Sequence, residues 1–155
     1  LLPEITSLDG ARQALHCVTK AEGDSSLRFA ATLSGLDAEA AERVCVRLNA
    51  PRRFRELALL WVQQADALQQ AANAEAVLSV LEQSDALRRP ERFAALLDVF
   101  AALVPSANVD FWQRAQRRFA GVDAAAIAAE GHPGHEIAAR LRAQRLLALQ
   151  ALISA

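Results

Sequence analysis

The sequence predicts an all-α fold, a compact array of about eight or nine short helices with no sheet. Strong helix formers dominate the chain, above all Ala, Leu, Arg, Glu and Gln. Tyr is absent, and the strand-favouring residues Val, Ile and Thr are sparse. Hydrophobic residues make up 53% of the 155 positions, which is enough for a core. Because short helices with one apolar face are unstable alone, we expect them to pack against each other.

The first half of the chain contains four predicted helices separated by turn residues. They are expected at 11–22, 27–33, 38–48 and 52–70. Ser25 or Ser26 is the expected N-cap of the second helix. The third helix is expected to begin after a capping box at Ser34 or after Asp37. Apolar side chains of the long fourth helix recur at helical spacing and should face the core: Phe54, Leu57, Ala58, Trp61, Ala65 and Leu68.

The second half contains five more predicted helices. They are expected at 74–83, 90–104, 109–120, 124–130 and 135–153. Asn73, Asn108 and Asp123 are expected N-caps, and Gly121 and Gly131 are expected stops. The last helix carries an apolar stripe of Ile137, Leu141, Leu146, Leu149 and Leu152.

A short basic joint at residues 85–93 separates two apolar helical runs near the middle of the chain. Pro90 suits the first turn of a helix, where its missing N–H removes no hydrogen bond. The joint carries Arg88, Arg89 and Arg92, which are available either to phosphates or to ion pairs. For Arg89, the ion-pair alternative is Asp85 or Glu91.

The charge of the chain excludes a protein that binds nucleic acid through overall basicity, because its formal net charge is −1. Lys20 is the only lysine, so arginine supplies nearly all of the positive charge. Further arginine clusters lie at 52–55, 114–118 and 140–145, and a solvated face is the alternative interpretation of each. The cluster at 52–55 lies at the start of a helix, where positive side chains are unfavourable because the helix dipole is also positive there. Its placement therefore suggests a functional reason.

The few cysteines and histidines predict no metal or redox centre. Cys17 and Cys45 are widely spaced among apolar residues and are expected to be buried thiols in a reducing cytosol. His132 and His135 flank a Pro-Gly turn, so we interpret them as part of a solvated turn. The chain has no membrane-spanning run and no signal peptide, and we expect a cytoplasmic protein. It begins without Met and contains none, which indicates a fragment of a longer protein.

Several motifs, in order, resemble the C-terminal half of a bacterial CCA-adding tRNA nucleotidyltransferase. The joint is similar to the pattern D-x-x-R-(R/K)-P-x-R-F of that family. The other similar segments are the "LPE(I/L)" start at 1–5, the strip at 27–30, the helix start at 48–58 and the glycine-bounded tail at 131–145. Together these segments touch most of the chain.

The resemblance implies a helical region that holds the acceptor and T-arm side of tRNA through its backbone. In that family a separate N-terminal head carries the catalytic carboxylates and selects nucleotides. This segment alone is therefore expected to be non-catalytic and to need no cofactor, with Mg and CTP or ATP bound only in the missing head. The expected parts are a helical body at 1–104 with a degenerate HD-like region and a helical tail at 105–155, packed as one compact unit.

The HD phosphohydrolase site of some family members is expected to be lost here. His16 aligns with the first ligand position, but Ser34 and Gly35 stand where the paired His-Asp should be. Neither residue supplies the imidazole and carboxylate that such a metal site uses. The D-A-R-G-R motif of the family also has no counterpart, because residues 106–109 fill that neighbourhood.

The sequence thus favours a tRNA-binding segment that partners its own N-terminal head, with a homodimer as a further expectation. The candidate RNA-binding residues are Arg52, Arg53, Arg88, Arg89, Arg92, Arg114, Arg117, Arg118, Arg140 and Arg145. The alternative is a helical protein-interaction or dimerisation module without RNA binding, built on the long apolar helices at 54–68 and 135–153.

Overall fold

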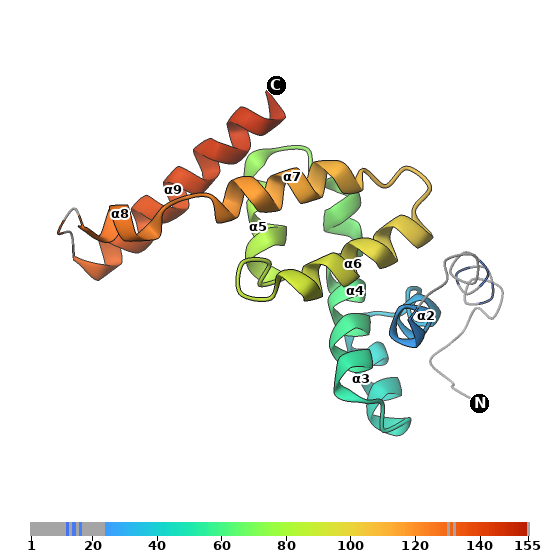
Figure 1. The fold of residues 1–155 in the computed structure, drawn as a ribbon. Coiled ribbons are helices and arrows are strands. Elements are labelled where there is room, and N and C mark those ends of the chain that lie inside the picture. The colour runs from blue at the N-terminus through green and yellow to red at the C-terminus, as the bar shows by residue number, and fades with distance from the viewer. Residues whose placement is uncertain are drawn as a thin grey trace.

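The computed structural model describes residues 24–129, 131 and 133–154, together with 12, 14 and 16. These residues form helices and connecting turns, with no strand among them (Figure 1). The helices are α2 (Ser25–Thr32), α3 (Ala38–Arg47), α4 (Arg52–Gln70), α5 (Ala74–Gln83), α6 (Pro90–Leu103), α7 (Val109–Ala120), α8 (Ala124–Ala129) and α9 (Gly134–Ile153). The all-α prediction is confirmed for the described part. The described part contains seven helices of eight residues or more and the short α8, whereas about eight or nine helices were expected for the whole chain.

Local capping determines where most of the helices begin. Asn73 accepts a hydrogen bond from the Ala76 amide at 2.9 Å, as predicted for α5. Asp37 caps α3 through the Ala40 amide at 2.7 Å, which selects it over the capping box at Ser34. The predicted cap of α2 is wrong. Asp24 holds that place by accepting from the Ser26 amide at 3.0 Å, so the helix begins earlier than expected.

The remaining boundaries agree closely with the expected ones. The bounds of α4, α5 and α7 are those predicted, and α3 and α6 each end one residue early. The predicted end of α8 at residue 130 lies outside the described residues. The expected helix at 11–22 lies mostly outside the described residues, although positions 12, 14 and 16 are helical.

One hydrophobic cluster joins all the described helices except α8. α4 contacts α2, α3, α5 and α6, while α7 packs on α5 and α6, and α9 packs on α5 and α7. Phe93, Leu96, Leu78 and Leu149 are fully buried within this cluster. Of the inward positions predicted on α4, Leu57, Ala58, Trp61 and Leu68 are buried, and Phe54 and Ala65 are half-buried.

α8 and the beginning of α9 extend away from the other described helices, whereas the rest of α9 packs on α5 and α7 (Figure 1). Among the described helices, α8 contacts α9 alone. On α9 only Leu149 of the predicted stripe is fully buried, and the other four positions are half-buried. Leu147 is 57% exposed on the same helix. The predicted division between 1–104 and 105–155 stays a prediction.

Cys45 is a buried thiol in α3, as the sequence predicts. Burial raises the pKa of Cys45, and the nearby Glu42 carboxylate raises it further. A raised pKa keeps the thiol protonated and unreactive. Cys17 lies outside the described residues. Within the described chain, no helix has the length and apolar character needed to cross a bilayer.

Candidate nucleic-acid interface

The basic joint between α5 and α6 is a tight helix end with a defined geometry. Asp85 has φ +55°, a left-handed conformation that non-glycine residues seldom adopt. The Ala86 amide donates to the Leu81 carbonyl at 3.0 Å, and the Asp85 amide donates to the Glu82 carbonyl at 3.1 Å. This pair of bonds is the Schellman arrangement, which satisfies the last carbonyls of α5. Asp tolerates the left-handed region better than most residues, so the chain turns here without glycine.

Three contacts from outside the turn hold the joint in place. Gln116 of α7 donates to the Ala86 carbonyl at 3.0 Å. Arg92 in the first turn of α6 donates to the Ser84 carbonyl at 2.9 Å. The Phe93 ring meets the Trp112 ring of α7 edge-on, with the centroids 6.5 Å apart. The joint is therefore fixed by both α6 and α7, and its backbone holds the arginine side chains in defined orientations.

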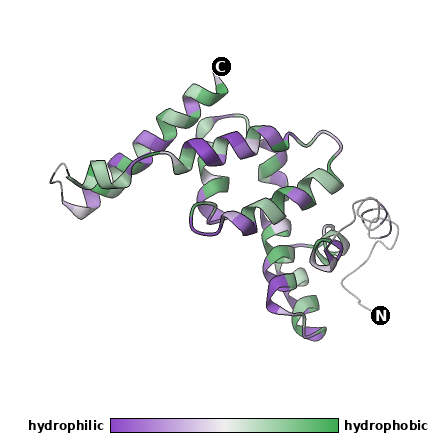
Figure 2. Cartoon of the chain, viewed as in Figure 1, coloured by the Kyte–Doolittle hydropathy of each residue, from purple (hydrophilic) through white to green (hydrophobic). Residues whose placement is uncertain are grey.

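Arginines from two distant segments line one groove beside the joint. Arg52 and Arg53 come from the first turn of α4, and Arg89 and Arg92 come from the start of α6. The groove has a volume of about 610 Å³, and Leu57 and Ala95 add apolar surface to its lining. We call it the α4–α6 groove. Hydrophilic residues gather at the joint beside it in Figure 2.

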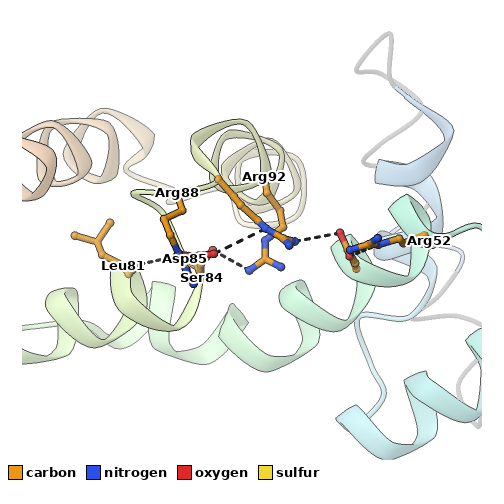
Figure 3. A network of polar contacts seen from close by, with 8 residues as sticks. Arg52, Leu81, Ser84, Asp85, Arg88 and Arg92 are labelled. Atoms are coloured by element: carbon orange, nitrogen blue, oxygen red, sulfur yellow. Dashed lines mark hydrogen bonds and ion pairs between the residues drawn. The ribbon is translucent and has the colours of Figure 1, made fainter.

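Carboxylates hold the groove arginines in position. The Arg52 Nε lies 2.7 Å from Glu56 Oε1, and the Arg89 Nη1 lies 3.6 Å from Glu56 Oε2. Arg53 forms an ion pair with Asp24, the N-cap of α2. At the joint itself, Asp85 accepts from Arg88 at 2.9 Å and lies 3.8 Å from Arg89. Figure 3 shows this network running from the joint to Arg52.

Four guanidinium groups and two carboxylates, Glu56 and Glu91, line the groove, so its net charge is positive. The hydrogen bond from Arg52 is the main cause that lowers the pKa of Glu56, and the charges of Arg52, Arg89 and Arg92 add to it. The hydrogen bond from Arg88 likewise lowers the pKa of Asp85. Both carboxylates therefore stay ionised at neutral pH and keep their arginines oriented.

These lowered pKa values predict a loss of stability in acid. The unfolded chain binds protons at Glu56 and Asp85 at roughly pH 4, before the folded chain does. Their stabilising contribution is thus present above that pH and is lost as the pH falls through the depressed folded pKa. Urea unfolding between pH 6 and pH 3 measures how the free energy of unfolding falls in acid. Combining Glu56→Gln with Asp85→Asn is expected to make that fall, the acid limb, shallower.

Asp98 provides the control of opposite sign. Burial raises the pKa of Asp98, so protonation of this residue favours the folded chain as the pH falls. Asp98→Asn removes that gain, so the free energy of unfolding should fall in acid at least as steeply as in the wild-type chain. A flat acid limb in the wild-type chain would contradict the assignment.

A second basic surface lies on α7, formed by Arg114, Arg117 and Arg118. All three side chains are exposed, and none forms an ion pair or hydrogen bond with another described residue. Arg117 and Arg118 occupy the last turn, where positive charge complements the helix dipole. We call these residues the α7 basic face.

The two candidate arginines on α9 differ from each other. Arg140 is exposed, whereas Arg145 is half-buried with its guanidinium 4.3 Å from the centre of the Phe119 ring. Burial lowers the pKa of Arg145, against the opposing charge of Glu82. The Arg145 Nε is buried and has no hydrogen-bond partner. Arg145 thus serves to pack α9 on α7.

Of the predicted site residues, the structure brings four together in the groove: Arg52, Arg53, Arg89 and Arg92. Arg88 lies on the adjacent turn, and the α7 basic face and Arg140 lie on other helices. Sequence reasoning missed Glu56, the carboxylate between two groove arginines. Its spacing of four residues from Arg52 is a detectable signal for that ion pair. Reasoning from the sequence also missed Gln116, because no local pattern links residue 116 to the joint.

The histidines gain no metal partners in the described part of the chain. No group of three or more His, Cys, Asp or Glu side chains there is placed to hold a metal ion. His132 lies outside the described residues. Ser34 and Gly35, where the HD pair was expected, occupy the turn between α2 and α3. The expected loss of the HD site stays a prediction.

Comparison with known proteins identifies several relatives. A CCA-adding enzyme from Pseudomonas putida is 31% identical over an alignment of 159 positions, and the match covers 97% of this chain and 43% of that protein. A multifunctional CCA protein from an Azoarcus species is 36% identical over an alignment of 129 positions, and the match covers 74% of this chain and 31% of the relative. A CCA-adding enzyme from Bordetella pertussis is 40% identical over 105 residues, or 66% of this chain and 28% of the relative.

No protein-family model matches the chain, and no solved structure matches it. The curated relatives are much longer, and the chain spans less than half the length of each of the three. All three relatives are named as CCA-adding enzymes or multifunctional CCA proteins, in agreement with the family that the motifs of this chain resemble. The chain is therefore homologous to a part of the CCA-adding enzymes.

Proposed function

We propose that this chain is the helical, tRNA-binding C-terminal region of a CCA-adding tRNA nucleotidyltransferase. It clamps the backbone of the acceptor and T arms while an N-terminal head adds nucleotides. The observation that carries this proposal is the convergence of Arg52, Arg53, Arg89 and Arg92 on one groove from two elements. The homology to CCA-adding enzymes supports tRNA as the partner.

The groove suits phosphates better than bases. Guanidinium groups bind phosphate oxygens through paired hydrogen bonds, and such contacts fix the position of a nucleic acid without reading its sequence. Leu57 and Ala95 offer apolar surface between the arginines, but no aromatic ring lines the groove for base stacking. The α7 basic face is the candidate for a second set of backbone contacts, because its three arginine side chains are exposed and have no partner among the described residues.

This proposal predicts a steep salt dependence of tRNA binding. Neutralising four phosphates gives a slope of about −3.6 in a plot of log affinity against log salt, or about a 10²-fold loss between roughly 50 mM and 200 mM salt. Fluorescence anisotropy with a labelled tRNA transcript measures this slope. An affinity that barely changes over that range would contradict a backbone clamp.

A second candidate function is dimerisation through α9. Leu147 and Ile153 are 57% and 40% exposed, and only Leu149 on this helix is fully buried. Exposed apolar side chains on an extended helix suit a partner helix. Sedimentation velocity separates the two functions, because a concentration-dependent dimer without tRNA affinity favours this second one.

A further inference from the structure

The position of Glu56 raises a question about how the α4–α6 groove receives a phosphate. One carboxylate oxygen of Glu56 accepts from Arg52 at 2.7 Å, and the other lies 3.6 Å from Arg89. The carboxylate thus lies between guanidinium groups of two segments that are 37 positions apart in sequence. A phosphodiester also presents two charged oxygens to a guanidinium pair. Glu56 therefore occupies the position that a phosphate would take.

We propose that Glu56 is an internal competitor of the phosphodiester, which must displace it from Arg52 and Arg89 to bind in the groove. This inference rests on the proposed tRNA-binding function and adds a regulatory element to the same site. In the unliganded chain, Glu56 keeps Arg52 and Arg89 oriented toward one point. When RNA binds, the carboxylate turns out to water and the two guanidinium groups take the phosphate.

The side chains that must move are free to do so. Arg52 is 81% exposed and Glu56 is 34% exposed, so both reach solvent by rotation about side-chain bonds. Arg89 is 41% exposed, which leaves its guanidinium accessible to a ligand. Exposed ion pairs of this kind are weak because water and salt screen them, so a phosphate can compete with Glu56 for both guanidinium groups.

The other groove arginines have separate anchors and stay in place. Arg53 is paired with Asp24 of α2, and Arg92 donates to the Ser84 carbonyl of the joint. They hold the walls of the groove while Glu56 leaves. A competing carboxylate also favours a strongly charged backbone over weak anions, because a ligand must outcompete it.

Glu91 offers a matched control. It lines the same groove and carries the same charge, but it forms no ion pair with another described residue. Glu56→Gln and Glu91→Gln therefore remove equal charge from one site, and only the first removes a competitor.

The test measures binding of a labelled tRNA transcript to the 155-residue chain at fixed salt. Glu56→Gln is expected to raise affinity by about two- to fivefold, the fold-change that corresponds to one exposed ion pair, and by more than Glu91→Gln does. Arg52→Gln should weaken binding more in the Glu56→Gln background than in the wild-type chain, because Arg52 is then free for RNA. Circular dichroism checks that each variant is folded.

The outcomes separate the inference from the function beneath it. If the wild-type chain binds tRNA with a steep salt dependence but Glu56→Gln and Glu91→Gln act equally, the competitor role is overturned and the clamp stands. Equal effects of Arg52→Gln in both backgrounds overturn it as well. If neither the wild-type chain nor Glu56→Gln binds tRNA, the proposed function and the inference both fail.

Discussion

Phe93→Ala is expected to lower the free energy of unfolding by about 3 to 5 kcal/mol, the range for removing a fully buried aromatic ring. Phe93 is 0% exposed and lies in the first turn of α6, at the end of the joint. Its ring packs edge-on against Trp112 of α7, which is itself 2% exposed. Truncation leaves a cavity between the two helices and removes the aromatic contact. Because α6 and α7 both hold the joint, the α4–α6 groove should also lose order.

Phe111→Ala is the matched control for that result. The Phe111 ring also meets Trp112 edge-on, with its centroid 5.6 Å away, but its side chain is only half-buried. The same truncation should therefore cost clearly less. Urea unfolding followed by circular dichroism measures both changes. Equal losses for the two variants would mean that burial beneath the joint is not what makes Phe93 important.

Capping and turn residues made the helix boundaries predictable, because their hydrogen bonds join residues close in sequence. Asn73 and Asn108 each accept from an amide three residues ahead, as their positions predict. The start of α2 was misassigned because Asp24, Ser25 and Ser26 are all competent caps in one run. Local pattern alone does not select among them, and the carboxylate of Asp24 makes the bond.

The groove was predictable only in part, because it depends on how α4 packs against α6. The sequence identifies Arg52, Arg53, Arg89 and Arg92 as candidates but gives two separate clusters. Their convergence is a tertiary contact, and so is the ion pair between Arg89 and Glu56. Sequence spacing predicted ion pairing of Arg89 with Asp85 or Glu91, and the structure places Arg89 near Asp85 and Glu56 instead of Glu91.

Arg145 illustrates a different limit of reasoning from sequence. A cluster of arginines on a helix suggests a basic surface, yet the environment of each side chain decides its role. The Arg145 guanidinium stacks on Phe119, because α9 turns this position toward α7. The spacing of α9 did contain this signal, since Arg145 lies four residues from both Leu141 and Leu149 and so shares the face of the predicted apolar stripe. The arginine cluster drew attention to its charge instead.

Replacing Arg52, Arg53 and Arg89 together with Gln is expected to weaken tRNA binding by about 10²-fold and to reduce the salt slope by about 3. Each phosphate contact that is lost removes about one unit from that slope. These three arginines line the groove, whereas Arg92 is left intact because its bond to the Ser84 carbonyl supports the joint. Anisotropy titrations of a labelled tRNA transcript at several salt concentrations measure both quantities.

The control removes the same charge elsewhere. Arg28, Arg43 and Arg47 are exposed on α2 and α3 and do not line the groove. Replacing these three with Gln changes the net charge equally, so any effect of overall charge appears in both triple variants. The groove triple should lose far more affinity, because a convergent set of guanidiniums binds one stretch of backbone while scattered ones bind none. Equal losses would locate the RNA contact in the general charge of the surface and refute the groove as the clamp.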